Sequence, residues 1–143
     1  MRTGFLGALF IGIVSAGLAS QKPAPPPPCQ DEETMVADYT KDLTALTATV
    51  KGEDLQAFQR GFHRKTCLTK LTLCAGILDG AAACFEKAAN DPATAQDQVG
   101  ACKAKHDRYA KLKEKVSKYR DTLQATEDYK ASKAMIEKFD FAD

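Results

Sequence analysis

The chain has 143 residues, of which 20 are Lys or Arg, 19 are Asp or Glu and 44% are hydrophobic. This composition is typical of one small globular domain, and it excludes a collagen-like chain, a disordered polyelectrolyte and a polytopic membrane protein. The chain also contains 5 Cys and no Trp, but composition alone identifies no activity.

The first twenty residues have the layout of a secretory signal peptide. A basic start at Arg2 precedes a nearly unbroken apolar run from Phe5 to Val14, and small residues follow as far as Ser20. The run is well short of the roughly 20 apolar residues that cross a bilayer, so a transmembrane anchor is the weaker interpretation. We therefore expect a signal peptide at 1–20 and a secreted, extracellular mature chain.

A proline-rich stretch, 21–28, follows the predicted signal peptide, and five of its eight residues are Pro. Because Pro has no backbone N–H and cannot continue a helix, this stretch is expected to be an extended spacer before a single domain at 29–143. Loss of 1–20 removes one basic residue, Arg2, and leaves 19 basic and 19 acidic side chains. A chain without excess positive charge is not expected to bind nucleic acid.

From Cys29 onward the hydrophobic pattern is helical, and no alternating strand pattern appears. The first helix is expected to end at Gly52, and a second helix follows with Gly61 as one of its weak points. A turn is expected at Asn90–Pro92, with the proline at the first position of the next helix. A last helix running to the C-terminus would be too long for a compact domain, so we expect a break near Thr126. The predicted fold class is all-α, a small disulfide-clipped helical bundle of three long or four to five shorter helices.

Five cysteines in a secreted domain leave one unpaired when the others form disulfides. Residues that face each other across an antiparallel helix hairpin lie equally far from its turn. The first predicted turn places Cys29 level with Cys74, and the second places Cys84 level with Cys102. We therefore expect these two disulfides, with Cys67 as an unpaired thiol that could join two chains in a disulfide-linked dimer.

The two histidines suggest a metal site as an alternative use of the cysteines. His63 and Cys67, and likewise Cys102 and His106, are spaced to share a helix face, and two such pairs on facing helices could form a tetrahedral zinc site. The expected turn, however, displaces the pairs by roughly 10 Å along the helix axis, and an oxidising compartment opposes free thiolates. We expect no metal and no cofactor. The chain also lacks a recognisable catalytic motif, so we expect no enzyme activity.

The segment from Lys103 to Arg120 contains eight basic and two acidic residues. Five of the basic residues fall on the helix side opposite the apolar stripe: Lys103, Arg108, Lys111, Lys115 and Lys118. This surface could bind an extracellular protein, an anionic glycan or an anionic lipid surface. The alternative is a solvated helix face that only keeps the protein soluble.

The leading hypothesis is a secreted, non-enzymatic binding protein that acts extracellularly through the surface of a helical bundle. The first alternative is a carrier that holds a small hydrophobic ligand in a cavity between helices. Its lining would come from the larger apolar side chains: Val36, Tyr39, Leu43, Phe58, Phe62, Leu71, Leu78 and Phe85. The second alternative is a secreted membrane-active or host-directed factor.

Overall fold

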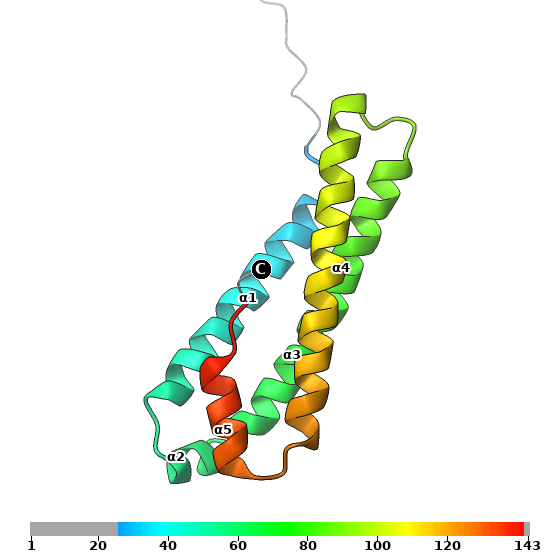
Figure 1. The fold of residues 1–143 in the computed structure, drawn as a ribbon. Helices are drawn as coiled ribbons and strands as arrows, with labels where there is room; N and C mark the ends of the chain where they lie inside the picture. The colour runs from blue at the N-terminus through cyan, green and yellow to red at the C-terminus, as the bar shows by residue number, and fades with distance from the viewer. Residues whose placement is uncertain (1–25, 142–143) are drawn as a thin grey trace, which may run out of the picture.

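The computed structural model describes residues 26–141, so the predicted signal peptide and most of the predicted spacer lie outside the described residues. Within this range the chain forms helices and no strand, which confirms the predicted all-α bundle. In chain order the helices are α1 (Gln30–Lys51), α2 (Leu55–Arg60), α3 (His63–Asn90), α4 (Gln96–Ala125) and α5 (Tyr129–Lys138). The three long helices α1, α3 and α4 form the body of the molecule (Figure 1).

Helix α3 lies at the centre of the bundle, where it packs along α4 and also contacts α1, α2 and α5. By length and composition it could cross a membrane, since it has 28 residues and a mean hydropathy of 1.4 in its apolar window. Its central position accounts for that apolarity, because its inner face is buried against the neighbouring helices. In Figure 1, α1 and α4 lie close together at the upper end and diverge downward, and α5 fills the lower part of the gap.

Local signals set several helix ends where the sequence predicted them. Three acidic residues occupy the first turn of α1, and Gly52 ends the helix by donating its N–H to the carbonyls of Thr49 and Val50. The expected break at Thr126 is confirmed, and α5 begins two residues after Glu127. The carboxylate of Asp128 caps α5 by accepting a 2.7 Å hydrogen bond from the backbone N–H of Ala131.

Two predicted boundaries were wrong. The second predicted helix is divided at Gly61 into α2 and α3, because Phe62 adopts a left-handed backbone conformation with φ 53°. Pro92 does not begin α4; it lies in a turn stabilised by a hydrogen bond from the backbone N–H of Thr94 to the carbonyl of Asp91. The first helical residue after that turn is Gln96, so α4 starts four residues later than expected.

A single hydrophobic core runs the length of the bundle. Each of the helices α1 to α5 contributes side chains to this core. Full burial of one large apolar side chain stabilises the fold by roughly 1.5–3 kcal/mol. The side chains that are at most 2% exposed include Leu43, Val50, Phe58, Leu71, Leu78, Phe85, Val116, Leu123 and Ile136.

Candidate functional site

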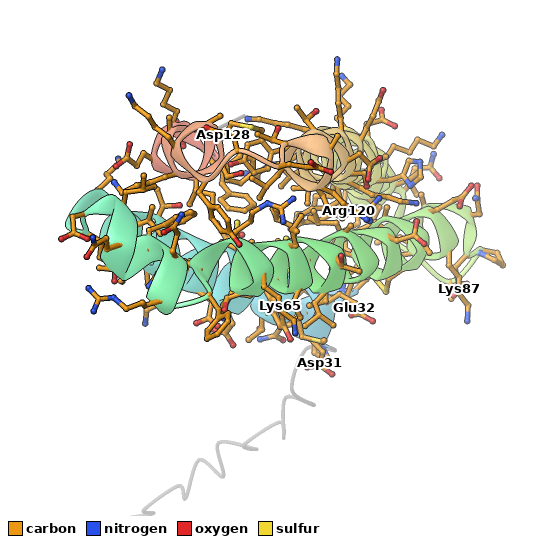
Figure 2. All side chains as sticks on the ribbon, turned by 90° about the horizontal axis from the view of Figure 1, so that it is seen from below. Asp31, Glu32, Lys65, Lys87, Arg120 and Asp128 are labelled. Atoms are coloured by element: carbon orange, nitrogen blue, oxygen red, sulfur yellow. A yellow bond between two sulfur atoms is a disulfide. The ribbon has the colours of Figure 1, made fainter. Side chains whose placement is uncertain are left out.

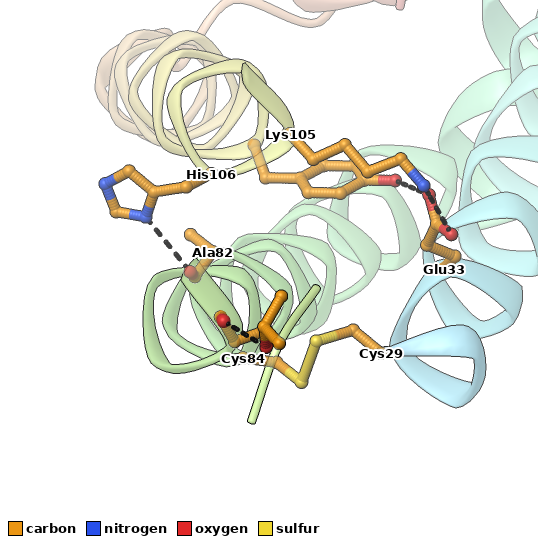
Figure 3. Close-up of a disulfide and its surroundings, with 9 residues drawn as sticks. Cys29, Glu33, Ala82, Cys84, Lys105 and His106 are labelled. Carbon is orange, nitrogen blue, oxygen red and sulfur yellow. Dashed lines mark hydrogen bonds and ion pairs between the residues drawn. A yellow bond between two sulfur atoms is a disulfide. The ribbon is translucent and has the colours of Figure 1, made fainter. Parts of the chain in front are cut away.

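One disulfide, Cys29–Cys84, fastens the start of α1 to α3 (Figure 3), with the two Cα atoms 5.9 Å apart. The predicted pair Cys29–Cys74 is therefore wrong. The reason is α2, which lengthens the connection between α1 and α3 to residues 52–62 and moves its midpoint to residue 57. That midpoint places Cys29 almost level with Cys84 instead of Cys74.

The predicted pair Cys84–Cys102 is also wrong, although both residues lie nine positions from residue 93, the midpoint of the connection 91–95. They are level in the hairpin but differ in direction around their helices. Cys84 is bonded to the start of α1, whereas Cys102 is 3% exposed and belongs to the core. The position of a residue along the hairpin axis does not show which way its side chain points, so the sequence could not distinguish a cysteine that faces α1 from one that faces the core.

Three thiols, those of Cys67, Cys74 and Cys102, are unpaired and buried. The unpaired state of Cys67 is as expected. Burial raises the pKa of the Cys67 thiol from 9.0 to about 12 and that of Cys74 from 9.0 to about 11. Both groups are therefore neutral and weakly nucleophilic at neutral pH. Because Cys67 is 3% exposed, a disulfide to a second chain would require α3 to separate from its neighbours.

The two histidine–cysteine pairs lie far apart, so the structure does not assemble the alternative zinc site. His63 starts α3, and its Nε2 lies 2.9 Å from a carboxylate oxygen of Glu53. His106 Nδ1 donates a 3.0 Å hydrogen bond to the carbonyl of Ala82 (Figure 3). The part of α4 that is level with His63 lies near Leu123, roughly 25 Å along the axis from His106.

A second set of metal-type ligands lies at the disulfide itself. Cys29, Glu32 and Cys84 place one potential ligand atom each within 4.8 Å of one another. Both sulfur atoms are joined in the disulfide, however, and a metal requires thiolates. The two cysteines therefore act as a structural link between α1 and α3.

An open groove of about 690 Å³ runs between α1 and α4, and the end of the chain that follows α5 forms part of its lining. The α1 wall consists mainly of small side chains, Ala37, Thr40, Thr44, Ala45 and Ala48, and it also includes Val36 and the charged side chains of Glu33 and Lys41. The hydroxyls of the two threonines donate to carbonyls within α1 at 2.8 Å, so that wall presents no unpaired hydroxyl there. The opposite wall comes from Arg108, Tyr109 and Leu112, and Phe141 contributes at the lower end.

A polar cluster closes the upper end of the groove, where α1 meets α4 (Figure 3). Lys105 Nζ lies 2.8 Å from the carboxylate of Glu33, and the Tyr109 hydroxyl donates to the same carboxylate at 3.2 Å. The Lys105 ammonium also lies 5.0 Å from the centroid of the Phe85 ring, a distance at which a cation is attracted to an aromatic face. These contacts fix the separation of α1 and α4 at that end.

The predicted basic surface borders this groove. All five of its side chains are exposed, and Arg108 lines both the groove and a shallow neighbouring hollow that also includes Lys111 and Lys115. The other three basic residues of the segment form ion pairs: Lys105 with Glu33, Lys113 with Asp79, and Arg120 with Asp121. Two of these pairs tie α4 to other helices. The charge of the segment is therefore divided between structural ion pairs and an exposed basic edge.

The side chains expected to line a carrier cavity mostly form the packed core instead. Leu43, Phe58, Leu71, Leu78 and Phe85 are each at most 2% exposed and pack in one hydrophobic cluster. Phe62 lies at the opposite extreme, because its side chain is 71% exposed at the corner between α2 and α3. The proposed lining residues therefore do not surround a common cavity.

Sequence reasoning missed the groove, although a weak signal was present. Ala37, Thr40, Thr44 and Ala48 recur at helical spacings of three and four beside the buried stripe of α1. Small side chains on an exposed helix face are ordinary, so this pattern alone does not indicate a binding surface. The separation of α1 from α4 creates the groove, and that separation depends on tertiary packing.

No known family model, curated protein or solved structure matches this chain. A functional proposal therefore rests on the groove, its basic edge and the state of the reactive side chains.

Proposed function

We propose that the chain is a secreted, non-enzymatic protein that binds another extracellular protein through the groove between α1 and α4. The observation that carries this proposal is the groove itself. It is apolar along the α1 wall and lies between two long helices, and α5 fills only the lower part of the same gap. Apolar concave surfaces with a charged edge are typical of protein interaction sites.

The state of the reactive side chains supports a binding role over catalysis. The Cys67 and Cys74 thiols are buried, and their raised pKa values keep them protonated. His63 is engaged by a carboxylate and His106 by a backbone carbonyl. Neither a thiol nor an imidazole is among the side chains that line the groove.

The openness of the groove favours a protein partner over a small hydrophobic ligand. An alkyl chain lying in an open groove would keep its outer side in water and would lose much of the benefit of burial. A folded partner covers the groove and presents its own polar surface to solvent. The core residues considered for a carrier cavity are packed against one another, which gives the carrier hypothesis less support.

Site-specific photo-cross-linking tests this proposal. A photoreactive amino acid at Ala45 lies in the groove, whereas one at Ala83, which is exposed on α3, serves as the matched control. Extracellular fluid from the source is irradiated with each protein, and the partner joined through position 45 is identified and purified. Its affinity is then measured by calorimetry for the wild type, Ala45→Arg and Ala83→Arg.

We expect a partner that cross-links from position 45 and not from position 83. Its dissociation constant should rise at least tenfold for Ala45→Arg, because the bulky cationic side chain would occupy the groove beside the apolar wall. The dissociation constant should be unchanged for Ala83→Arg. Equal cross-linking from both positions, or full affinity in Ala45→Arg, would contradict the proposal.

A further inference from the structure

We infer that the partner segment bound in the groove is an amphipathic α-helix with acidic residues along the edge that meets α4. This inference rests on the proposed function and specifies the chemistry of the occupant. It follows from the shape of the gap between α1 and α4, from the chemistry of the groove walls and from the charges at their edges.

The chain's own fifth helix shows what the gap accommodates. Helix α5 lies in the lower part of the same gap, where Ser132 and Ile136 are at most 1% exposed. Above Phe141, the α1 wall continues upward from Thr44 to Glu33. These twelve residues span a rise of roughly 16 Å, which matches a partner helix of about three turns placed end to end with α5. Such a helix would pack as a fourth helix of the bundle beside α1, α3 and α4.

The composition of the groove walls favours a helix over an extended peptide. An extended segment presents unpaired backbone N–H and C=O groups, whereas a helix pairs these groups internally. The α1 wall offers methyl groups, and its threonine hydroxyls are engaged within α1. Small side chains on that wall also allow two helix axes to approach closely, toward the lower end of the usual 8–10 Å range. A helix with an apolar face therefore fits this surface best.

The charges around the groove favour acidic residues on one edge of the partner helix. The side chains lining the groove and the hollow beside it include four basic residues, Lys41, Arg108, Lys111 and Lys115, and two acidic residues, Glu33 and Asp107. The Glu33 carboxylate is already neutralised by Lys105. Lys41 lines the groove on α1, and Lys111 lines the hollow beside it on α4. Both are exposed, and no ion pair is formed by either within residues 26–141. Electrostatic complementarity therefore favours carboxylates on the partner.

Two synthetic peptides of fourteen residues provide the probe. They share one apolar face of Leu and Ala and differ only at the polar edge, which carries Glu in one and Lys in the other. Binding of each labelled peptide to the full chain is measured by fluorescence anisotropy at low and high salt. Backbone amide shifts of Ala37, Thr40 and Thr44 in NMR spectra locate the bound peptide.

We expect the Glu-edged peptide to bind at least tenfold more tightly than the Lys-edged peptide and to shift those amides. Lys111→Glu should weaken the Glu-edged peptide at least tenfold, and added salt should weaken it in the wild type. The matched control is Lys65→Glu, because Lys65 projects from α3 on the side away from α4 (Figure 2) and should leave binding unchanged.

Absence of binding by both peptides, equal binding of the two, or a Lys111→Glu variant that binds normally would overturn the inference. Saturable displacement of the Glu-edged peptide by palmitate or by heparin would likewise assign the groove to a lipid or a glycan. Failure of the acidic-helix inference can be distinguished from failure of the proposed function. A partner cross-linked from position 45 that binds Lys111→Glu with full affinity refutes the acidic helix and leaves the proposed function standing.

Discussion

Gly76 and Gly80 lie in the interior of α3 on its exposed side, and neither has a backbone conformation that requires glycine. A Cβ atom placed at either position meets no atom of the described residues within 4 Å. Glycine in a helix interior is less stable than Ala by about 1 kcal/mol, because more backbone freedom is lost on folding. At these two positions no close approach by another part of residues 26–141 offsets that cost.

We predict that Gly80→Ala raises the free energy of unfolding by about 0.5–1 kcal/mol. Gly61→Ala is the matched contrast, because its Cβ would lie 2.3 Å from Nε2 of His63 and would push the imidazole away from Glu53. That variant should be destabilised by about 1 kcal/mol. Urea unfolding of the three proteins measures both effects. A neutral or destabilised Gly80→Ala variant would show that the outer side of α3 is not open.

At the scale of single elements, Arg64 links α3 to the end of α4. Its guanidinium donates to the carbonyls of Leu123, Gln124 and Thr126 at 2.9 to 3.3 Å. These carbonyls belong to the last turn of α4, where helix carbonyls lack partners and the helix dipole is negative. The arginine therefore stabilises the end of α4 and the turn from which α5 begins.

Replacing Arg64 by Ala should lower the free energy of unfolding by about 1–3 kcal/mol, the range for losing charge-assisted hydrogen bonds at a partly buried site. Hydrogen exchange should accelerate most in residues 126–136, since α5 depends on that turn. Lys65→Ala, at the exposed neighbouring position, is the control and should change stability by less than about 0.5 kcal/mol. Uniform acceleration across the whole chain would argue against a local role for Arg64.

The elements that could be predicted are those with local signals. The apolar stripe of α1 ends at Gly52, and the break at Thr126 follows from the excessive length of one continuous helix. The division of the second helix falls at Gly61, one of its predicted weak points, but the corner there could not be predicted, because Phe62 adopts a left-handed conformation that is uncommon for an aromatic residue. That missed corner moved the midpoint of the first hairpin by about five residues and so misplaced the partner of Cys29.

At the scale of the whole molecule, the Cys29–Cys84 disulfide joins residues 55 positions apart and holds the start of α1 on α3. Replacing both cysteines by Ala should lower the free energy of unfolding by about 2–4 kcal/mol. A reducing agent should destabilise the wild type by a similar amount and leave the double variant unchanged. Peptide mapping without reduction should recover this bridge alone; recovery of Cys29 bonded to Cys74 would disprove the assignment.

The basic edge and the groove differ in how far the sequence could predict them. The exposed positions of Lys103, Lys111 and Lys118 follow from their place opposite the apolar stripe of α4. The groove depends on the distance between α1 and α4 and on the shortness of α5, which has 10 residues beside helices of 22 to 30. The distance between α1 and α4, and therefore the groove, cannot be predicted from the sequence of any one helix.

The two walls of the groove are fastened near its two ends. The disulfide and the Glu33–Lys105 ion pair hold α1 at the upper end, and α5 packs against α1 at the lower end. Because the groove is held at both ends, we expect the proposed binding to require little rearrangement of the chain. The entropic penalty of the proposed complex would then fall mainly on the incoming segment, and we expect the tightest binding from partners whose helix is already formed in solution.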